Sequence, residues 1–213
     1  MNFAQLKQSI LNNVNDPSGD LFSDEKIVLY INNALRDIYQ VLLNRSFYLN
    51  RKTVTVSFVA GTQTVLLPTD FLKPIFVKDK ESGFNIDIKT EREAIDARVP
   101  CVYFTRTVSG TPQVETRYIG WYEVPSSGFD VIVNYAPYIT LFADIPQQSD
   151  FLLDIPENHH NVIVYKATIL ILGQDIHNIE FWQNQYNEAM QGLIESFTED
   201  QQGQTVTDVM EDY

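Results

Sequence analysis

The first 43 residues carry apolar side chains at the spacing of amphipathic helices. From Phe3 to Val14 these side chains recur every three or four positions, and residues 16–19, Asp-Pro-Ser-Gly, interrupt the pattern. A second apolar stripe runs through residues 27–43 and follows Ser23, a residue typical of a helix N-cap. The pattern predicts a pair of helices within residues 1–48.

The middle of the chain changes to the two-residue period of β-strands. Val54, Val56 and Phe58 alternate with polar residues, and short runs of this kind recur up to residue 135. We expect hairpins that pair residues 53–58 with 64–67, 75–78 with 84–88, and 118–124 with 129–135. Further strands are expected at 102–108 and 114–117, and a short helix at 91–97. Residues 49–145 are therefore predicted to form an inserted antiparallel β domain.

Two more helices are expected after a loop at residues 137–156. Pro156 fits the first position of a helix and Gly173 fits its end, although many of the residues between them are β-branched. A last apolar stripe begins near Asn178 and ends near Phe197. We expect residues 146–197 to form a helix pair that completes a small bundle with the first two helices.

The last segment, residues 198–213, is polar and acidic and lacks periodicity. Such a segment does not fold alone, so we interpret it as an extended tail that docks on a partner. Its sizeable apolar side chains would be the anchors: Val206, Val209, Met210 and Tyr213. The predicted fold class is α+β, with terminal helices packed as a small bundle, an inserted antiparallel β domain and an extended C-terminal tail.

The 213-residue chain is strongly and unevenly acidic, with a formal net charge of −13. Residues 1–117 hold 14 basic and 13 acidic residues, whereas residues 118–213 hold Lys166 alone against 15 carboxylates. A surface of that sign repels phosphate, so tight nucleic-acid binding through the second half is disfavoured. Repulsion is useful if DNA must pass without adhering.

The sequence shows no pattern of residues that carries catalysis, and we expect no enzyme, cofactor or metal site. The only cysteine, Cys101, has no activating histidine nearby and is interpreted as a buried thiol. His159 and His160 are adjacent, and adjacent helical side chains point about 100° apart, so we interpret both as polar residues at a helix start. The longest apolar stretch, residues 162–172, is too short to cross a bilayer, and we expect a soluble protein.

Aromatic residues are frequent, at 13 Phe, 11 Tyr and 2 Trp. Trp121 with Tyr122, and Trp182 with Tyr186, have the chemistry to stack on bases or sugars. No basic residues are interleaved with them, so we interpret these pairs as core or subunit interface.

Four short segments, in this order, resemble the head-to-tail adaptor proteins of tailed double-stranded DNA bacteriophages. They are residues 32–39 (Asn-Asn-Ala-Leu-Arg-Asp-Ile-Tyr), residues 65–72 (Val-Leu-Leu-Pro-Thr-Asp-Phe-Leu), residues 119–123 continuing through 131–137, and residues 155–161 (Ile-Pro-Glu-Asn-His-His-Asn). The last of these opens a proline-led helix similar to the third helix of that family. The likeness covers most of residues 20–197.

The resemblance implies a structural virion protein that is assembled in the host cytoplasm. It implies a homo-oligomeric ring, of twelve copies, that docks beneath the portal protein and receives the next neck or tail component, with no membrane partner. DNA would pass through the axis without specific binding. If so, carboxylates after residue 118 are expected to line the channel, and the candidates are Glu123, Asp130, Asp144 and Asp150.

Two other functions stay open at this point. One is a binding module whose β domain recognises a sugar or a peptide while the helices dimerise. The other is a hydrolase that uses acidic residues.

Overall fold

The computed structural model describes residues 1–110, 114–139, 141–142, 155–173 and 176–207. The chain divides into two compact units. Residues Met1–Leu49 and Ile139–Tyr213 form one, called here the helical unit, and Asn50–Tyr138 form the other, called the β unit. The β unit is therefore an insertion between two parts of the helical unit.

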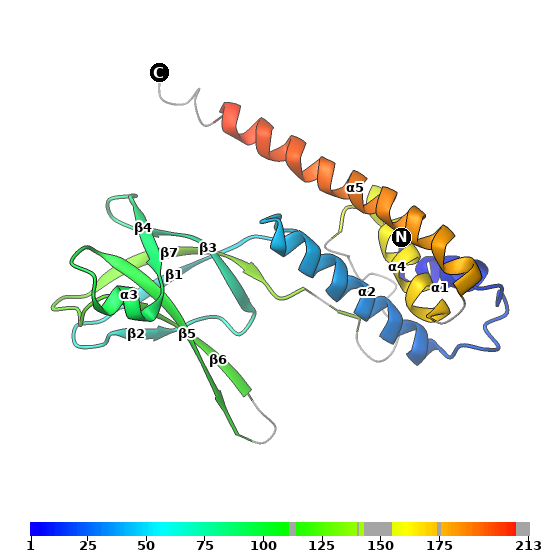
Figure 1. Ribbon diagram of the computed structural model, residues 1–213. Coiled ribbons are helices and arrows are strands. Elements are labelled where there is room, and N and C mark those ends of the chain that lie inside the picture. Colours follow the sequence, from blue (N-terminus) through cyan, green and yellow to red (C-terminus); the bar gives the residue numbers. More distant parts are fainter. Residues whose placement is uncertain (111–113, 140, 143–154, 174–175, 208–213) are drawn as a thin grey trace. The chain divides into compact units, whose positions relative to one another are not determined.

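The helical unit contains α1 (Phe3–Asn13), α2 (Asp24–Asn44), the 3₁₀ turn η1 (Glu157–His159), α4 (Asn161–Leu172) and α5 (Ile176–Thr207) (Figure 1). The three helices predicted around residues 3–14, 27–43 and 156–173 are confirmed. Asn2 and Gln5 form a capping box at the start of α1. The predicted turn after α1 is closed by the Asp16 carboxylate, which accepts hydrogen bonds from the backbone N–H groups of Asp20 and Leu21 at 3.1 and 3.0 Å.

Helix α4 lies at the centre of this unit and contacts α1, α2 and α5. Val162, Ile163 and Ala167 of α4 are fully buried and share one apolar cluster with Leu6 of α1 and Ile31 of α2. Burial on several sides explains why α4 is apolar all round and lacks a polar face. From α5, Tyr186, Met190 and Leu193 enter the same cluster.

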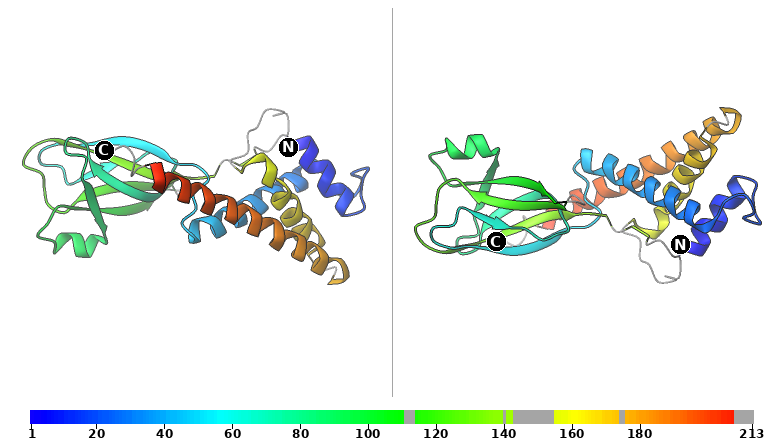
Figure 2. Two further views of the ribbon diagram at one scale, coloured as in Figure 1. Left: turned by 90° about the horizontal axis from the view of Figure 1, so that it is seen from above. Right: turned by 90° about the horizontal axis from the view of Figure 1, so that it is seen from below.

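The last helix is longer than the sequence predicted. The prediction of an extended tail from residue 198 is wrong for residues 198–207, which continue α5 to Thr207. In Figure 2 these last turns of α5, coloured red, extend beyond the other helices of the unit. Glu199, Gln201, Gln202 and Gln204 are good helix formers, and extending an already formed helix costs little per residue, so an apolar stripe is not needed to prolong it.

The β unit is built from β1 (Lys52–Phe58), β2 (Thr64–Leu66), β3 (Phe71–Asp79), β4 (Asn85–Lys89), β5 (Cys101–Ser109), β6 (Val114–Trp121) and β7 (Phe129–Pro137). A short helix, α3 (Glu91–Ile95), lies between β4 and β5, as predicted. Among the described residues the strands form one sheet in the order β1-β7-β3-β4-β5-β6-β2.

The positions of the strands were predicted better than the pairing between them. The hairpin of β3 with β4 is confirmed. The other two predicted hairpins are wrong, because β1 pairs with β7, β2 pairs with β6, and β6 also pairs with β5. The β4–β5 pair is parallel, with Asp87 opposite Cys101, so the sheet is mixed and not purely antiparallel.

The sheet curls so that its two edge strands come near each other. β1 and β2 stand at opposite ends of the strand order, yet residues 59–63 alone connect them. Five residues span at most about 18 Å, so the edges cannot lie far apart. The concave side encloses a separate core of ten buried residues: Val56, Phe58, Leu67, Phe71, Val77, Val102, Ile119, Val131, Val133 and Tyr135.

Candidate functional site

His160 and Cys101 have structural roles. The ring of His160 is buried, with Nε2 2.8 Å from the carbonyl oxygen of Ile155 and Nδ1 2.6 Å from the α-amino group of Met1. Cys101 is fully buried, and burial raises the pKa of its thiol, as expected for a core residue and not a nucleophile. Within the described residues, no three His, Cys, Asp or Glu side chains gather where they could hold a metal ion.

The aromatic pairs take part in packing. Trp121 is half-buried and lies 4.7 Å from the ring of Phe129 and 6.0 Å from the ring of Phe58, both in the β core. In the helical unit, Trp182 packs against Tyr165 at 5.8 Å, and Tyr186 is 8% exposed. These contacts support the interpretation of Trp121, Trp182 and Tyr186 as packing residues.

Charge is divided unevenly between the two units, as it is along the sequence. The β unit holds 10 basic and 10 acidic residues and is formally neutral. The helical unit holds 5 basic and 18 acidic residues, and therefore the entire net charge of −13. Any partner of opposite charge is accordingly directed to the helical unit.

Helix α5 presents a continuous acidic face. Glu180, Glu188 and Glu195 are exposed and lie within a 100° sector opposite the apolar stripe that enters the core. No lysine or arginine occurs in α5. The single basic residue after position 117, Lys166, is already paired with Asp37 of α2 at 3.0 Å. The charge of this face is therefore uncompensated by α5 itself.

The predicted channel residues lie in different settings. Asp130 on β7 is paired with Lys80, with 2.9 Å between Nζ and Oδ2, and hydrogen bonds from Ser57 and Lys80 lower its pKa. Glu123 lies exposed after β6 and accepts a hydrogen bond from the Tyr122 hydroxyl at 2.7 Å. Asp144 and Asp150 lie outside the described residues.

The predicted tail anchors are only partly described. Val206 belongs to the last turn of α5 and not to an extended segment. Val209, Met210 and Tyr213 lie outside the described residues.

Two arginines that the sequence analysis did not single out face each other on the β unit. Arg106 of β5 and Arg117 of β6 are direct partners in the antiparallel register, and Glu115 lies 3.9 Å from the first and 2.6 Å from the second. Like charges at opposed positions repel, so the intervening carboxylate stabilises the pair. Only the register reveals this cluster, since 10 residues separate the two arginines in the sequence.

Comparison with protein families resolves which of the open functions applies. The sequence model of the SU10 adaptor protein family matches residues 1–209. The chain belongs to the SU10 adaptor protein family. This is a family of phage head-to-tail adaptors, so the resemblance predicted from the sequence is confirmed. A comparison with curated proteins gives no match.

Membership in the SU10 adaptor protein family assigns a structural role at the junction of phage head and tail, as a component of the virion. A structural adaptor family of this kind suggests a protein without enzymatic activity. In the described part of the chain, no helix is both long and apolar enough to span a bilayer.

Proposed function

We propose that copies of this chain form a closed ring of twelve beneath the portal protein. The ring connects the capsid to the next neck or tail component and lets DNA pass through its axis. Assembly takes place in the host cytoplasm. The observation that carries this proposal is the match of residues 1–209 to a head-to-tail adaptor family. The concentration of charge on the helical unit supports it.

The axis of the ring is lined by carboxylates in this proposal. Glu180, Glu188 and Glu195 form an acidic face without a basic residue on the same helix, and this adds them to the channel candidates Glu123, Asp144 and Asp150. Like charge prevents DNA phosphates from adhering to the wall. Asp130 is the weakest of the earlier candidates because Lys80 already balances its charge.

The isolated protein is expected to be monomeric or weakly associated, because subunits that each carry a net charge of −13 repel one another. The test is to mix the full chain with purified portal rings of the same phage and to count bound subunits by native mass spectrometry and electron microscopy. A closed ring of copies on the portal supports the proposal. Failure to bind the portal overturns it, and a stable ring of the isolated chain at low salt contradicts the repulsion argument.

The channel is tested separately in assembled virions. Replacing Glu180, Glu188 and Glu195 with lysine should add phosphate contacts and slow genome ejection. A matched control places lysine at three exposed carboxylates of the β unit: Glu81, Asp87 and Asp96. If the two triple variants eject the genome at equal rates, the acidic face of α5 does not line the channel.

A further inference from the structure

A two-stranded ribbon leaves the sheet of the β unit. Arg106 to Ser109 of β5 pair with Val114 to Arg117 of β6. The pairing of β4 with β5 ends at Tyr103, and that of β2 with β6 begins at Tyr118. In the described part of the chain, both edges of the ribbon therefore lack a strand partner, although the Leu67 N–H donates to the Arg117 carbonyl at 3.0 Å, and Figure 1 shows the ribbon extending away from the sheet. An isolated two-stranded ribbon is only marginally stable in water, so a contact here would stabilise it.

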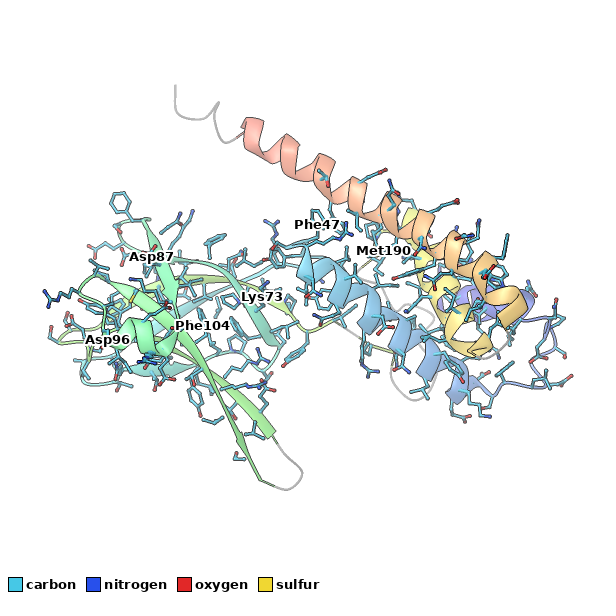
Figure 3. The ribbon with its side chains drawn as sticks, in the orientation of Figure 1. Phe47, Lys73, Asp87, Asp96, Phe104 and Met190 are labelled. Atoms are coloured by element: carbon cyan, nitrogen blue, oxygen red, sulfur yellow. The ribbon has the colours of Figure 1, made fainter. Side chains whose placement is uncertain are left out.

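A cavity of about 260 Å³ lies at the base of this ribbon. Its lining is apolar on the side of β3, where Phe71 stacks on Phe104 at 5.4 Å. Phe104, labelled in Figure 3, lies on β5 at the point where the ribbon begins. The cavity is smaller than most small-molecule sites, so its size suits one or two inserted side chains of a peptide.

Arginines form the polar side of the same cavity. The Arg117 guanidinium donates to the carbonyl of Leu72 and, at 2.8 Å, to the hydroxyl of Tyr138, but its buried Nε finds no acceptor among the described residues. The Arg106 side chain is 70% exposed, and its nearest carboxylate, Glu115, is 3.9 Å away and shared with Arg117. The two arginines and the one glutamate leave this side of the cavity with a net positive charge. The Arg117 Nε, for which the described residues supply no acceptor, lies on the same cavity as Phe71 and Phe104, which form its apolar floor.

We propose that this cavity binds the C-terminal segment, residues 208–213, of a second copy of the chain. That segment reads Asp-Val-Met-Glu-Asp-Tyr and combines three carboxylates with three apolar or aromatic side chains, the two kinds of group that the cavity can contact. Met210 or Tyr213 fills the apolar floor, and Glu211 and Asp212 pair with Arg106 and Arg117. The proposal rests on the ring, in which each copy has a neighbour to receive its segment.

The apolar lining favours this occupant over nucleic acid. A phosphate makes no use of the apolar floor formed by Phe71 and Phe104, whereas the side chain of Met210 or Tyr213 fills it. The segment follows residues 198–207, which continue α5 about 15 Å beyond Phe197, a residue of that helix packed against the apolar cluster. It therefore begins one helical extension away from this packed residue.

The first experiment measures binding of the segment itself. A fluorescein-labelled peptide of residues 204–213 is titrated with a chain that ends at Thr207, which keeps α5 complete, and fluorescence polarisation is recorded. Saturable binding is expected, with at least a tenfold loss for Arg106→Glu and no change for Arg98→Glu, an equal charge change at an exposed site of the β unit. A peptide with Glu211→Lys and Asp212→Lys should bind Arg106→Glu better than it binds the unchanged cavity.

The second experiment asks whose segment is bound. Full-length Arg106→Glu has a segment without a functional cavity, and the chain ending at Thr207 has a cavity without a segment. Neither should self-associate, but their mixture should form heterodimers by light scattering at high concentration. If the peptide binds but the mixture forms no heterodimers, the cavity binds the segment of its own chain. That result would overturn the role of a second copy.

The remaining outcomes are also decisive. No saturable peptide binding, or equal binding by Arg106→Glu, overturns the assignment of the cavity, and binding of a short DNA duplex that Arg106→Glu abolishes would assign it to nucleic acid instead. These measurements need no portal protein. Loss of portal binding with peptide binding intact would therefore reject the proposed function alone, and the reverse result would reject this inference alone.

Discussion

Asn32 of α2 holds the backbone of Phe142 by two hydrogen bonds. The side-chain Nδ2 donates to the carbonyl oxygen of Phe142 at 3.0 Å, and its Oδ1 accepts from the N–H of Phe142 at 2.9 Å. The two residues are 110 positions apart, and the β unit lies between them in the sequence. A single amide thus fixes the point where the chain rejoins the helical unit.

Replacing this amide should destabilise the helical unit. Asn32→Ala leaves both backbone groups of Phe142 without these partners, which is expected to cost about 1–3 kcal/mol in the free energy of unfolding. Urea denaturation followed by circular dichroism measures the change. Asn33→Ala removes only a surface bond to Arg36 and is the control, with an effect within about 0.5 kcal/mol. Equal effects of the two variants would show that Asn32 does not fix the returning chain.

Gly120 is expected to tolerate no side chain. Tyr103 is its direct partner on β5, and a Cβ added to Gly120 would lie 2.1 Å from Cζ of that ring. Gly120→Ala should therefore displace the buried ring and cost about 1–3 kcal/mol. Combining it with Tyr103→Leu should recover part of that loss, since a smaller side chain leaves room. If Gly120→Ala alone left the melting temperature unchanged, the ring would not rest on the glycine.

Gly192 of α5 is the opposite case. A Cβ at this position would meet nothing within 4 Å, so alanine adds helix propensity without a clash. Gly192→Ala should stabilise the protein by about 0.5–1 kcal/mol, measured by thermal denaturation of the isolated chain. Destabilisation of the isolated chain would contradict the open space at this site.

His160 should make stability fall as the pH decreases below about 6.5, the ordinary pKa of histidine. Burial of the ring lowers its pKa below the ordinary value near 6.5, and Glu157 and the Met1 amine are the charged groups beside it. Because the unfolded state binds the proton more readily, the contribution is present above pH 6.5 and is lost as the pH falls through the lower, folded pKa.

The check is the midpoint of urea denaturation at pH 7.5 and 5.5. The wild-type midpoint should fall more steeply on acidification than that of His160→Gln, which has no titrating ring. His159→Gln, a change at the neighbouring half-buried residue, is the control and should keep the wild-type slope. Identical slopes for all three proteins would show that His160 does not titrate within this window.

Lys166 should link three helices through one charge. Its ammonium lies 3.0 Å from the Asp37 carboxylate of α2 and 5.4 Å from the centre of the Tyr186 ring of α5. Lys166→Met keeps the aliphatic stem but removes both interactions, and a loss of about 1 kcal/mol is expected. Lys26→Met, at an exposed position of α2, should change the unfolding free energy by less than half as much. If the two variants lost similar amounts of unfolding free energy, Lys166 would contribute no more than an ordinary surface lysine.

The sequence predicted the helices well because their signal is local. Three- and four-residue spacing placed α1 and α2 within a few residues of their observed bounds, and Pro156 and Gly173 marked the segment that holds α4. The end of α5 was misjudged because periodicity reports the packing of one face. It does not report how far the backbone continues once packing ends, as it does from Phe197 to Thr207.

The sequence predicted less of the candidate interaction surfaces. The excess of acidic residues after position 117 is evident in the sequence. The net charges of the two units, zero for the β unit and −13 for the helical unit, follow only when residues 139–213 are grouped with residues 1–49. The arginine cluster at the ribbon was not predicted, since no spacing rule places Arg106 opposite Arg117.

The sequence by itself determined which segments are helix and which are strand, except for residues 198–207, and it showed the resemblance to phage adaptors and no catalytic motif. The tertiary structure alone decided the pairing of β1 with β7 and of β2 with β6, and the cavity formed where β3 meets the ribbon. The physical reason is the range of the forces involved. Backbone propensity and amphipathic spacing act over a few residues, whereas strand partners and cavities depend on contacts between residues that are distant in the chain.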